Sequence, residues 1–153
     1  MDIYKYTSSE FKNCIGLFIS NADKFFDKSE LEQYAEFLSG EALNGDYFIV
    51  KQNNLTVGAG GFVIHENAFW LDWGIVHRSK HRQGIGTKLL EYRLSKIYQE
   101  NKSPTIRLCT SQHTVGFYKK YGFKVLSFTK NGYGVNLHKY MLEKRVDQIR
   151  AVT

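Results

Sequence analysis

Two closely spaced glycines carry the clearest chemical signal in this sequence. After an apolar run that ends at Val76, the chain reads His81-Arg82-Gln83-Gly84-Ile85-Gly86-Thr87 and continues as an amphipathic stretch. Glycine lacks a Cβ, so the backbone can turn tightly and bring its N–H groups against a ligand. The first N–H groups of a helix have no intrahelical partner and lie at the positive end of the helix dipole. The segment therefore predicts a strand-to-helix loop that binds a phosphate or pyrophosphate.

Other glycine-rich phosphate loops fit this segment less well. A dinucleotide-binding βαβ unit needs a third glycine, and Leu89 stands at that position. A Walker loop needs G-x-x-x-x-G-K-[ST], which the sequence does not contain. Considered alone, the segment is also compatible with a plain strand-to-helix turn that uses glycines.

A second segment, residues 110–123, makes the interpretation more specific. It contains Phe117-Tyr118 and ends with Gly122-Phe123. Together the two segments resemble the GNAT superfamily of acyl-CoA N-acyltransferases. The first is similar to the family's Q/R-x-x-G-x-G/A loop, which receives the pyrophosphate and pantetheine of acetyl-CoA. The second is similar to a later helix that commonly ends in F-Y-x-x-x-G-F, and the resemblance extends roughly over 47–142.

The resemblance implies a set of residues around acetyl-CoA, which would be a co-substrate in a reaction without a metal. The sequence departs from the family pattern at His81, where the family has Gln or Arg, and at Ser111 and Thr114, where it often has Asn and Ala. In the family one strand splays from its neighbour, so backbone groups near Ile75 bind pantetheine and supply the oxyanion donor. The implied cofactor-binding residues are Ile75, Val76, His81, Arg82, Gln83, Gly84, Ile85, Gly86, Thr87, Ser111, Thr114 and Phe117.

Acyl transfer from a thioester to an amine needs a group that takes a proton from the amine and one that gives a proton to the thiolate. Tyr118 is the candidate acid, because the family's tyrosine lies near the cofactor sulfur and a phenol with a pKa of roughly 10 keeps its proton at neutral pH. Packing with Phe117 and Phe123 is the alternative role. Asp72 is the candidate base, since it interrupts an apolar strand where burial would raise the pKa of a carboxyl group. A structural hydrogen bond, or a base acting through water, is the alternative there.

Other reactive side chains lie near these segments. His77, His81 and His113 match no zinc-binding spacing, so surface or phosphate-facing roles are expected, with His113 also a candidate for substrate contact. Cys109 lies in no Cys–His arrangement, which favours direct transfer over a covalent acyl-enzyme. The aromatic pair Phe25-Phe26 is a candidate for the acceptor pocket, because family acceptors lie near the first two helices.

The hydrophobic patterning predicts elements that place these residues on one sheet. Ser8 or Ser9 is expected to cap a first helix whose apolar face includes Ile19, and a turn at 130–132 is expected to join the last two strands. The element order βααβββαβαββ is that of a single-domain α/β fold with a mixed, mostly antiparallel sheet flanked by helices, as in the GNAT family. Strands are expected at 3–7, 47–51, 56–65, 69–76, 106–110, 123–128 and 134–142, with helices at 8–19, 29–40, from the glycine loop to 101, and at 114–121.

The composition fits one globular domain over 1–153 in the cytoplasm. Of the 153 residues 42% are hydrophobic, yet no apolar stretch is long enough to cross a bilayer, so a membrane is not expected as a partner. The basic segment at about 144–153 is expected to be a solvated tail. Two cysteines, Cys14 and Cys109, are too few for a disulfide framework, which favours a reducing compartment.

The formal charge of +6 indicates an anionic partner. Acetyl-CoA satisfies this expectation. A non-catalytic acyl-CoA-binding module is an alternative to an enzyme, and a nucleic-acid-binding domain is a weaker one. The acceptor is expected to be a small-molecule or peptide amine, and the net charge favours one that carries some negative charge. A homodimer is compatible with the family. The sequence does not identify the acceptor.

Overall fold

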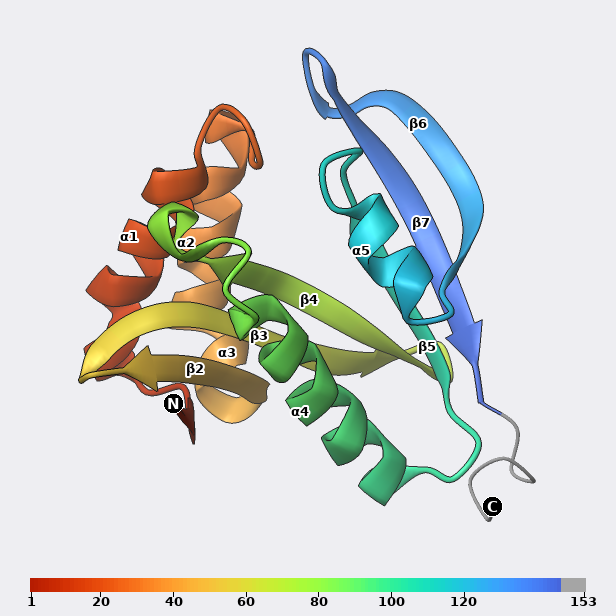
Figure 1. Ribbon diagram of the computed structural model, residues 1–153, viewed down its shortest axis with the longest axis horizontal. Coiled ribbons are helices and arrows are strands. Elements are labelled where there is room, and N and C mark those ends of the chain that lie inside the picture. Colours follow the sequence, from red (N-terminus) through yellow and green to blue (C-terminus); the bar gives the residue numbers. More distant parts are fainter. Residues whose placement is uncertain (147–153) are drawn as a thin grey trace.

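Seven strands form one twisted sheet in the computed structural model, which describes residues 1–146 (Figure 1). The strands span Asp2–Lys5 (β1), Asp46–Gln52 (β2), Leu55–His65 (β3), Ala68–Val76 (β4), Thr105–Thr110 (β5), Lys124–Gly134 (β6) and Leu137–Arg145 (β7). Their order in the sheet is β1-β2-β3-β4-β5-β7-β6, and every neighbouring pair is antiparallel except β4 and β5. The expected α/β fold with a mostly antiparallel sheet is confirmed. Most of the predicted basic tail lies outside the described residues.

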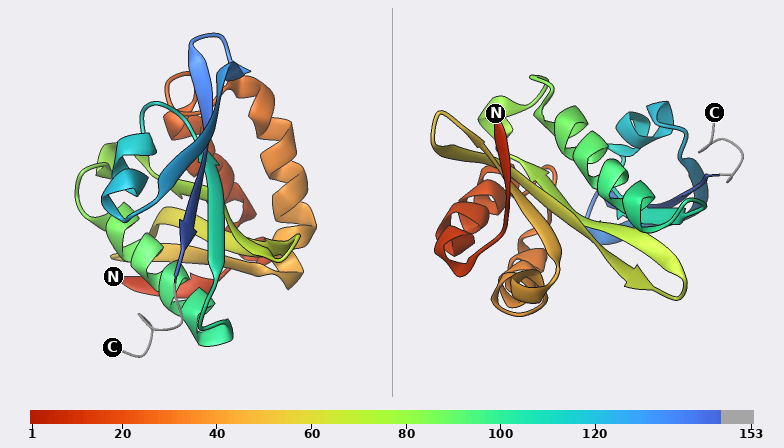
Figure 2. Two further views of the ribbon diagram at one scale, coloured as in Figure 1. Left: turned by 90° about the vertical axis from the view of Figure 1, so that its right-hand side faces the viewer. Right: turned by 90° about the horizontal axis from the view of Figure 1, so that it is seen from below.

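Helices cover both faces of this sheet (Figure 2). They span Phe11–Asn21 (α1), Leu31–Ser39 (α2), Glu41–Asn44 (α3), Ile85–Glu100 (α4) and Val115–Lys120 (α5). On one face, Phe18 of α1 and Tyr34 of α2 belong to a buried cluster that includes Ile49 of β2. On the opposite face, Leu90 and Ile97 of α4 belong to a second cluster. No helix within the described residues is long and apolar enough to span a membrane.

The start of the first helix differs from the sequence prediction. Ser8 and Ser9 lie in a 3₁₀ turn that precedes α1, and no side-chain hydrogen bond caps that turn or α1. Ile19 points to solvent and is 59% exposed, so its assignment to the apolar face is wrong. Cys14 and Leu17 are buried instead, because they share the helix face of Phe18 at helical spacing.

Strand β6 is longer than predicted, β7 is shifted along the chain, and the turn between them lies further along as well. The chain reverses at 135–136, where Asn136 has a φ of +60°, whereas Asn131 lies in an irregularity within β6. The prediction of a turn at 130–132 is therefore wrong. Both asparagines adopt a left-handed backbone, which asparagine tolerates, so local sequence does not decide which one ends the strand. This hairpin, residues 124–145, is called the β6–β7 arm below.

Candidate active site

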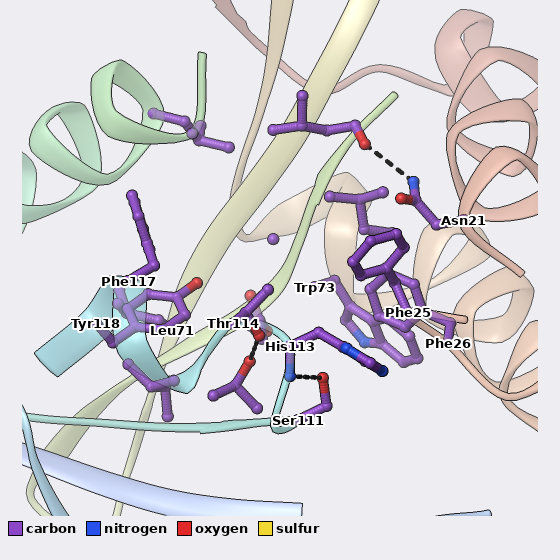
Figure 3. Close-up of a pocket in the computed structure, with 18 of the residues that line it drawn as sticks. Asn21, Phe25, Phe26, Leu71, Trp73, Ser111, His113, Thr114, Phe117 and Tyr118 are labelled. Carbon is purple, nitrogen blue, oxygen red and sulfur yellow. Dashed lines mark hydrogen bonds between the residues drawn. The ribbon is translucent and has the colours of Figure 1, made fainter. Parts of the chain in front are cut away.

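A cavity of about 680 Å³ lies where β4 and β5 separate. The two strands pair only through Phe69 with Ile106 and Trp70 with Arg107, and beyond these pairs they diverge (Figure 1). The diverging strands leave a gap through the sheet between its two helix-covered faces. The walls come from β4, β5, α4, α5, the β6–β7 arm and the α1–α2 loop, residues 22–30. Figure 3 labels side chains of β4, of α5, of the α1–α2 loop and of the segment after β5.

A bulge in β4 shapes the centre of this cavity. The pairing with β3 shifts register between Ala59 and Gly61, and opposite this shift Trp73 has a φ of +42°. A Cβ at Gly61 would collide with the backbone of β2, so the neighbouring strands approach too closely there for any other residue. The bulge turns Trp73 towards α2, where its ring lies 4.8 Å from that of Tyr34, and directs the following backbone into the cavity.

The glycine loop forms one wall, on the side of α4. Gly84 has a φ of +83°, ends the loop and begins α4 without a side-chain cap. No atom lies within 4 Å of the place where its Cβ would stand, and a Cβ at Gly86 would meet nothing closer than 3.9 Å. Space for a ligand therefore lies beside the first turn of α4, whose N–H groups have no intrahelical partner, and Lys80 and Arg82 line the same wall. This cationic cradle fits a phosphate or pyrophosphate group.

Most of the predicted cofactor-binding residues line this one cavity, but two do not. Gln83 is exposed, and its side chain donates to the Ser79 carbonyl oxygen (3.4 Å). Ile85 is buried in the core with Val50. A side-chain contact between either residue and a ligand is therefore not supported. The predicted residues that line the cavity are Ile75, Val76, His81, Arg82, Gly84, Gly86, Thr87, Ser111, Thr114 and Phe117.

Two of the three nearby histidines have structural partners. Nε2 of His81 lies 2.9 Å from the Val76 carbonyl oxygen, a hydrogen bond that ties the glycine loop to β4. Nδ1 of His77 accepts from the Ser79 backbone N–H (3.2 Å). His113 lines the cavity, and its pKa is lowered by burial and by the charge of Lys24. Within residues 1–146, no three His, Cys, Asp or Glu side chains are grouped to hold a metal ion.

The loop after β5 contributes hydroxyl groups to the opposite wall. Ser111 is buried, and its Oγ accepts from the His113 backbone N–H (3.2 Å; Figure 3). The hydroxyl group of Thr114 forms a hydrogen bond with that of Thr110. Both hydroxyls are thus oriented by the protein, and each retains capacity for one more hydrogen bond.

Tyr118 lies at the centre of the cavity. Its ring packs against Phe117 and Phe123, at centroid distances of 5.1 and 5.9 Å. Its hydroxyl points into the cavity and lies 3.6 Å from the point where a Cβ of Gly74 would stand (Figure 3). The packing role and the site role considered for Tyr118 are therefore compatible, because the ring supports the hydroxyl.

Asp72 has the properties expected of a base. Its Oδ1 is buried and has no hydrogen-bond partner. Burial, with a smaller contribution from the charge of Glu41, raises the pKa of Asp72 to about 7, against an opposing effect of Arg93. A carboxyl group with this pKa exchanges protons readily at neutral pH. Cys109 also lines the cavity, but burial raises the pKa of its thiol, which makes it a poor nucleophile.

Arg93 of α4 is a site residue that the sequence analysis missed. It is only 2% exposed, and its Nη1 donates to the Gly61 carbonyl oxygen (3.3 Å). Its guanidinium group lies against Gly74, about 3.2 Å from the point where a Cβ would stand. A signal was present, because this charged residue shares the helix face of Leu90 and Ile97. The residues that line the α2 side of the cavity were also missed: Glu30, Gln33, Trp70 and Tyr133.

The chain matches the family model described as "Acetyltransferase (GNAT) domain" over residues 11–144. No curated protein matches it. Its fold is similar to that of an aminoglycoside 6'-N-acetyltransferase complexed with coenzyme A, with a TM-score of 0.74 and 17% identity over 96% of this chain and 98% of that one. It is also similar to the ribosomal-protein-S18-alanine N-acetyltransferase from Escherichia coli, with a TM-score of 0.78 and 16% identity over 95% and 94% of the two chains. Ard1 from Thermoplasma volcanium has a TM-score of 0.75 and 16% identity over 95% and 97%.

Proposed function

Because the chain belongs to the GNAT family of acetyltransferases, we propose that it transfers the acetyl group of acetyl-CoA directly to an amine. One observation carries the proposal. A single cavity is lined by the N-terminus of α4 with cations at one wall, and by Asp72 and Tyr118 where β4 and β5 separate. A phosphate-bearing thioester and the two proton carriers of an acyl transfer would therefore meet in one place.

The chemistry of each cavity wall indicates which part of acetyl-CoA it would bind. The N–H groups at the start of α4, with Lys80 and Arg82, would hold the pyrophosphate. Backbone groups near Ile75 on β4 and the hydroxyl of Ser111 after β5 would hold the pantetheine between the diverging strands. When bound, acetyl-CoA supplies the activated acetyl group as a thioester. That one structural neighbour was crystallised with coenzyme A supports this cofactor.

The proton balance assigns a role to each central side chain. The reaction joins the amine nitrogen to the acetyl carbonyl carbon and breaks the carbon–sulfur bond. One proton must therefore leave the amine and one must reach the thiolate. Asp72 takes the first, directly or through water, because its raised pKa makes it a base at neutral pH. Tyr118 gives the second from a hydroxyl that faces the cavity.

The acceptor is an amine on a small molecule or a peptide. Structural neighbours named for aminoglycosides and for a ribosomal protein represent both classes, which supports leaving the choice between them to experiment. The two cysteines, Cys14 and Cys109, are free thiols, which supports a reducing cytoplasm as the place of action.

A thermal-shift series tests the proposal. The purified protein is melted alone, with acetyl-CoA, with free CoA and with duplex DNA, because a ligand that binds the native state raises the melting temperature. Stabilisation by both CoA species, followed by acetyl transfer in a mass-spectrometric amine screen, is the expected result. Stabilisation without transfer to any amine would indicate a binding module. Stabilisation by DNA alone would indicate the nucleic-acid alternative.

Gly86→Glu is expected to weaken acetyl-CoA binding by about a hundredfold or more, because it places a carboxylate in the cradle beside the pyrophosphate. Isothermal titration calorimetry measures the loss. Gly86→Ala is the matched control, since an added Cβ meets no atom closer than 3.9 Å and should leave binding nearly unchanged. Equal affinities of the Glu and Ala variants for acetyl-CoA would contradict the assignment of the phosphate site to the N-terminus of α4.

Tyr118→Phe is expected to lower kcat by about a hundredfold and to leave the affinity for acetyl-CoA unchanged. Phenylalanine keeps the ring contacts with Phe117 and Phe123 and removes only the proton donor. Steady-state kinetics and calorimetry separate the two quantities. Tyr121→Phe is the control, because Tyr121 also packs against Phe117 but does not line the cavity. An unaltered kcat for Tyr118→Phe would exclude it as the acid.

A further inference from the structure

The cavity has opposite charges on its two sides, which bears on the acceptor that the proposed function leaves open. On the α4 side the charged and titratable wall residues are all basic: Lys80, His81, Arg82 and Arg93. Within residues 1–146, two carboxylates line the cavity. Glu30 lies on the α2 side, and Asp72 belongs to β4. Asp72 is also influenced by the charge of Glu41 at the start of α3. This grouping runs against the net charge of +6, so composition alone does not produce it.

Glu30 is fixed in place at this wall and forms no salt bridge with another described residue. Its Oε2 accepts from the backbone N–H of Asp27 (3.0 Å), as part of a capping box that begins the 3₁₀ turn before α2. Burial and the charge of Asp27 raise the pKa of Glu30, whereas that hydrogen bond and the charge of Lys139 oppose the rise. A held, half-buried carboxylate without a salt bridge provides a site for a cation.

Aromatic rings complete the α2 side. Phe26 and Trp73 stack with their centroids 6.5 Å apart, and both line the cavity. Tyr133 of the β6–β7 arm lines it as well, and burial raises the pKa of its hydroxyl, with smaller contributions from Cys109, Glu30 and Tyr118. Aromatic faces and an apolar wall suit alkyl chains and ammonium groups alike.

The β6–β7 arm contacts the α1–α2 loop at this side of the cavity. A Cβ added at Gly134 would collide with the side chain of Asp27, so the arm and the α1–α2 loop are in close contact next to Glu30 and Tyr133. Two segments that are distant in the sequence therefore meet close to the Glu30 carboxylate. Electrostatic attraction is stronger in such a partly dehydrated place than at the open surface.

We propose that the acceptor is a dication with two amino groups, a diamine or polyamine chain, whose reacting nitrogen lies at Asp72 and whose second ammonium group binds Glu30. The two carboxylates have different tasks. The reacting nitrogen must be neutral to attack the thioester, so the extra proton of its ammonium form passes to Asp72 and then to water, and no lasting ion pair forms there. The proton that the nitrogen loses after the attack balances the one that Tyr118 gives to the thiolate. Besides capping the turn before α2, Glu30 places a carboxylate in the cavity that can pair with a charge that persists through the reaction. This proposal rests on the proposed acetyl transfer and specifies its acceptor.

The test compares primary alkylamines from propylamine to hexylamine with the α,ω-diamines of the same lengths. For the wild type we expect a higher kcat/KM with diamines at one or two chain lengths. Glu30→Gln keeps an oxygen for the Asp27 N–H and removes the charge, so it should lower kcat/KM for those diamines by roughly tenfold to a hundredfold. The monoamine values and the KM for acetyl-CoA should not change. Glu32→Gln, at an exposed position of α2, is the matched control.

Each outcome separates this proposal from acetyl transfer itself. Transfer without a diamine preference, or an equal loss for both amine classes in Glu30→Gln, overturns the dication proposal and leaves the function intact. The second readout is calorimetric binding of the diamines to the protein saturated with free CoA. Glu30-dependent binding without transfer to any amine supports the cation site and contradicts the acetyltransferase assignment.

Discussion

Replacing Asp72 by Asn is expected to lower kcat by about a hundredfold or more and to abolish the acidic limb of the pH–rate profile. In the wild type, activity should rise with pH through about 7, because only the ionised carboxylate accepts a proton from the amine. Asn keeps the shape of the side chain but cannot take up the proton. Steady-state kinetics between pH 5 and pH 9, with acetyl-CoA saturating, measure both effects. Asp2→Asn, at an exposed position of β1, is the control.

Stability distinguishes a catalytic Asp72 from a structural one. The pKa of this carboxyl group rises from 3.8 to about 7 on folding, so the folded protein binds more protons than the unfolded chain between these values. Its contribution to stability is therefore present below pH 4 and is lost as the pH rises through 7. Asp72→Asn should leave the melting temperature at pH 8 unchanged or raise it while activity falls. A clear decrease in the melting temperature would indicate a structural aspartate and contradict its role as the base.

The parts of the site that sequence patterns predicted are those that depend on local backbone geometry. The backbone before α4 is left-handed at Gly84, a conformation that glycine adopts readily. A few neighbouring residues are therefore enough to predict this part of the site. Tyr118 lies one helical turn from a left-handed Gly122, so its place is again set locally. Neither assignment requires knowledge of what lies across the cavity.

The parts that the sequence missed depend on contacts between distant segments. Tyr133 reaches the cavity only because β6 continues through Asn131, and local turn preferences favoured ending the strand there. Glu30 has the pattern of a helix cap, and that role is real, but its position at the cavity depends on the β6–β7 arm. The pKa of Asp72 likewise depends on the bulge of β4 and on α4, which pairing and packing create.

Arg93 of α4 contacts the bulged region of β3 and β4 and influences the pKa of Asp72. Its replacement should therefore change both stability and the pH dependence of activity. We expect Arg93→Met to move the acidic limb of the pH–rate profile above pH 7, because Arg93 opposes the rise in the pKa of Asp72. The apolar stem is kept, but the Gly61 carbonyl loses its donor, which should cost about 1–3 kcal/mol of unfolding free energy. Kinetics across pH and urea unfolding at pH 8 measure the two effects.

Two further variants show whether the charge of Arg93 acts through Asp72. Arg93→Lys keeps the positive charge and should leave the acidic limb near its wild-type position, even where the altered hydrogen-bond geometry lowers stability. Adding Arg93→Met to Asp72→Asn should produce no further change in the pH profile, because the titrating group is already gone. The destabilisation by Arg93→Met should also be smaller in that background, since no carboxylate then loses a neighbouring cation. If the acidic limb stays at its wild-type position in Arg93→Met, Arg93 only supports the bulge. The ionisation of Asp72 at neutral pH would then depend on water that reaches it through the cavity.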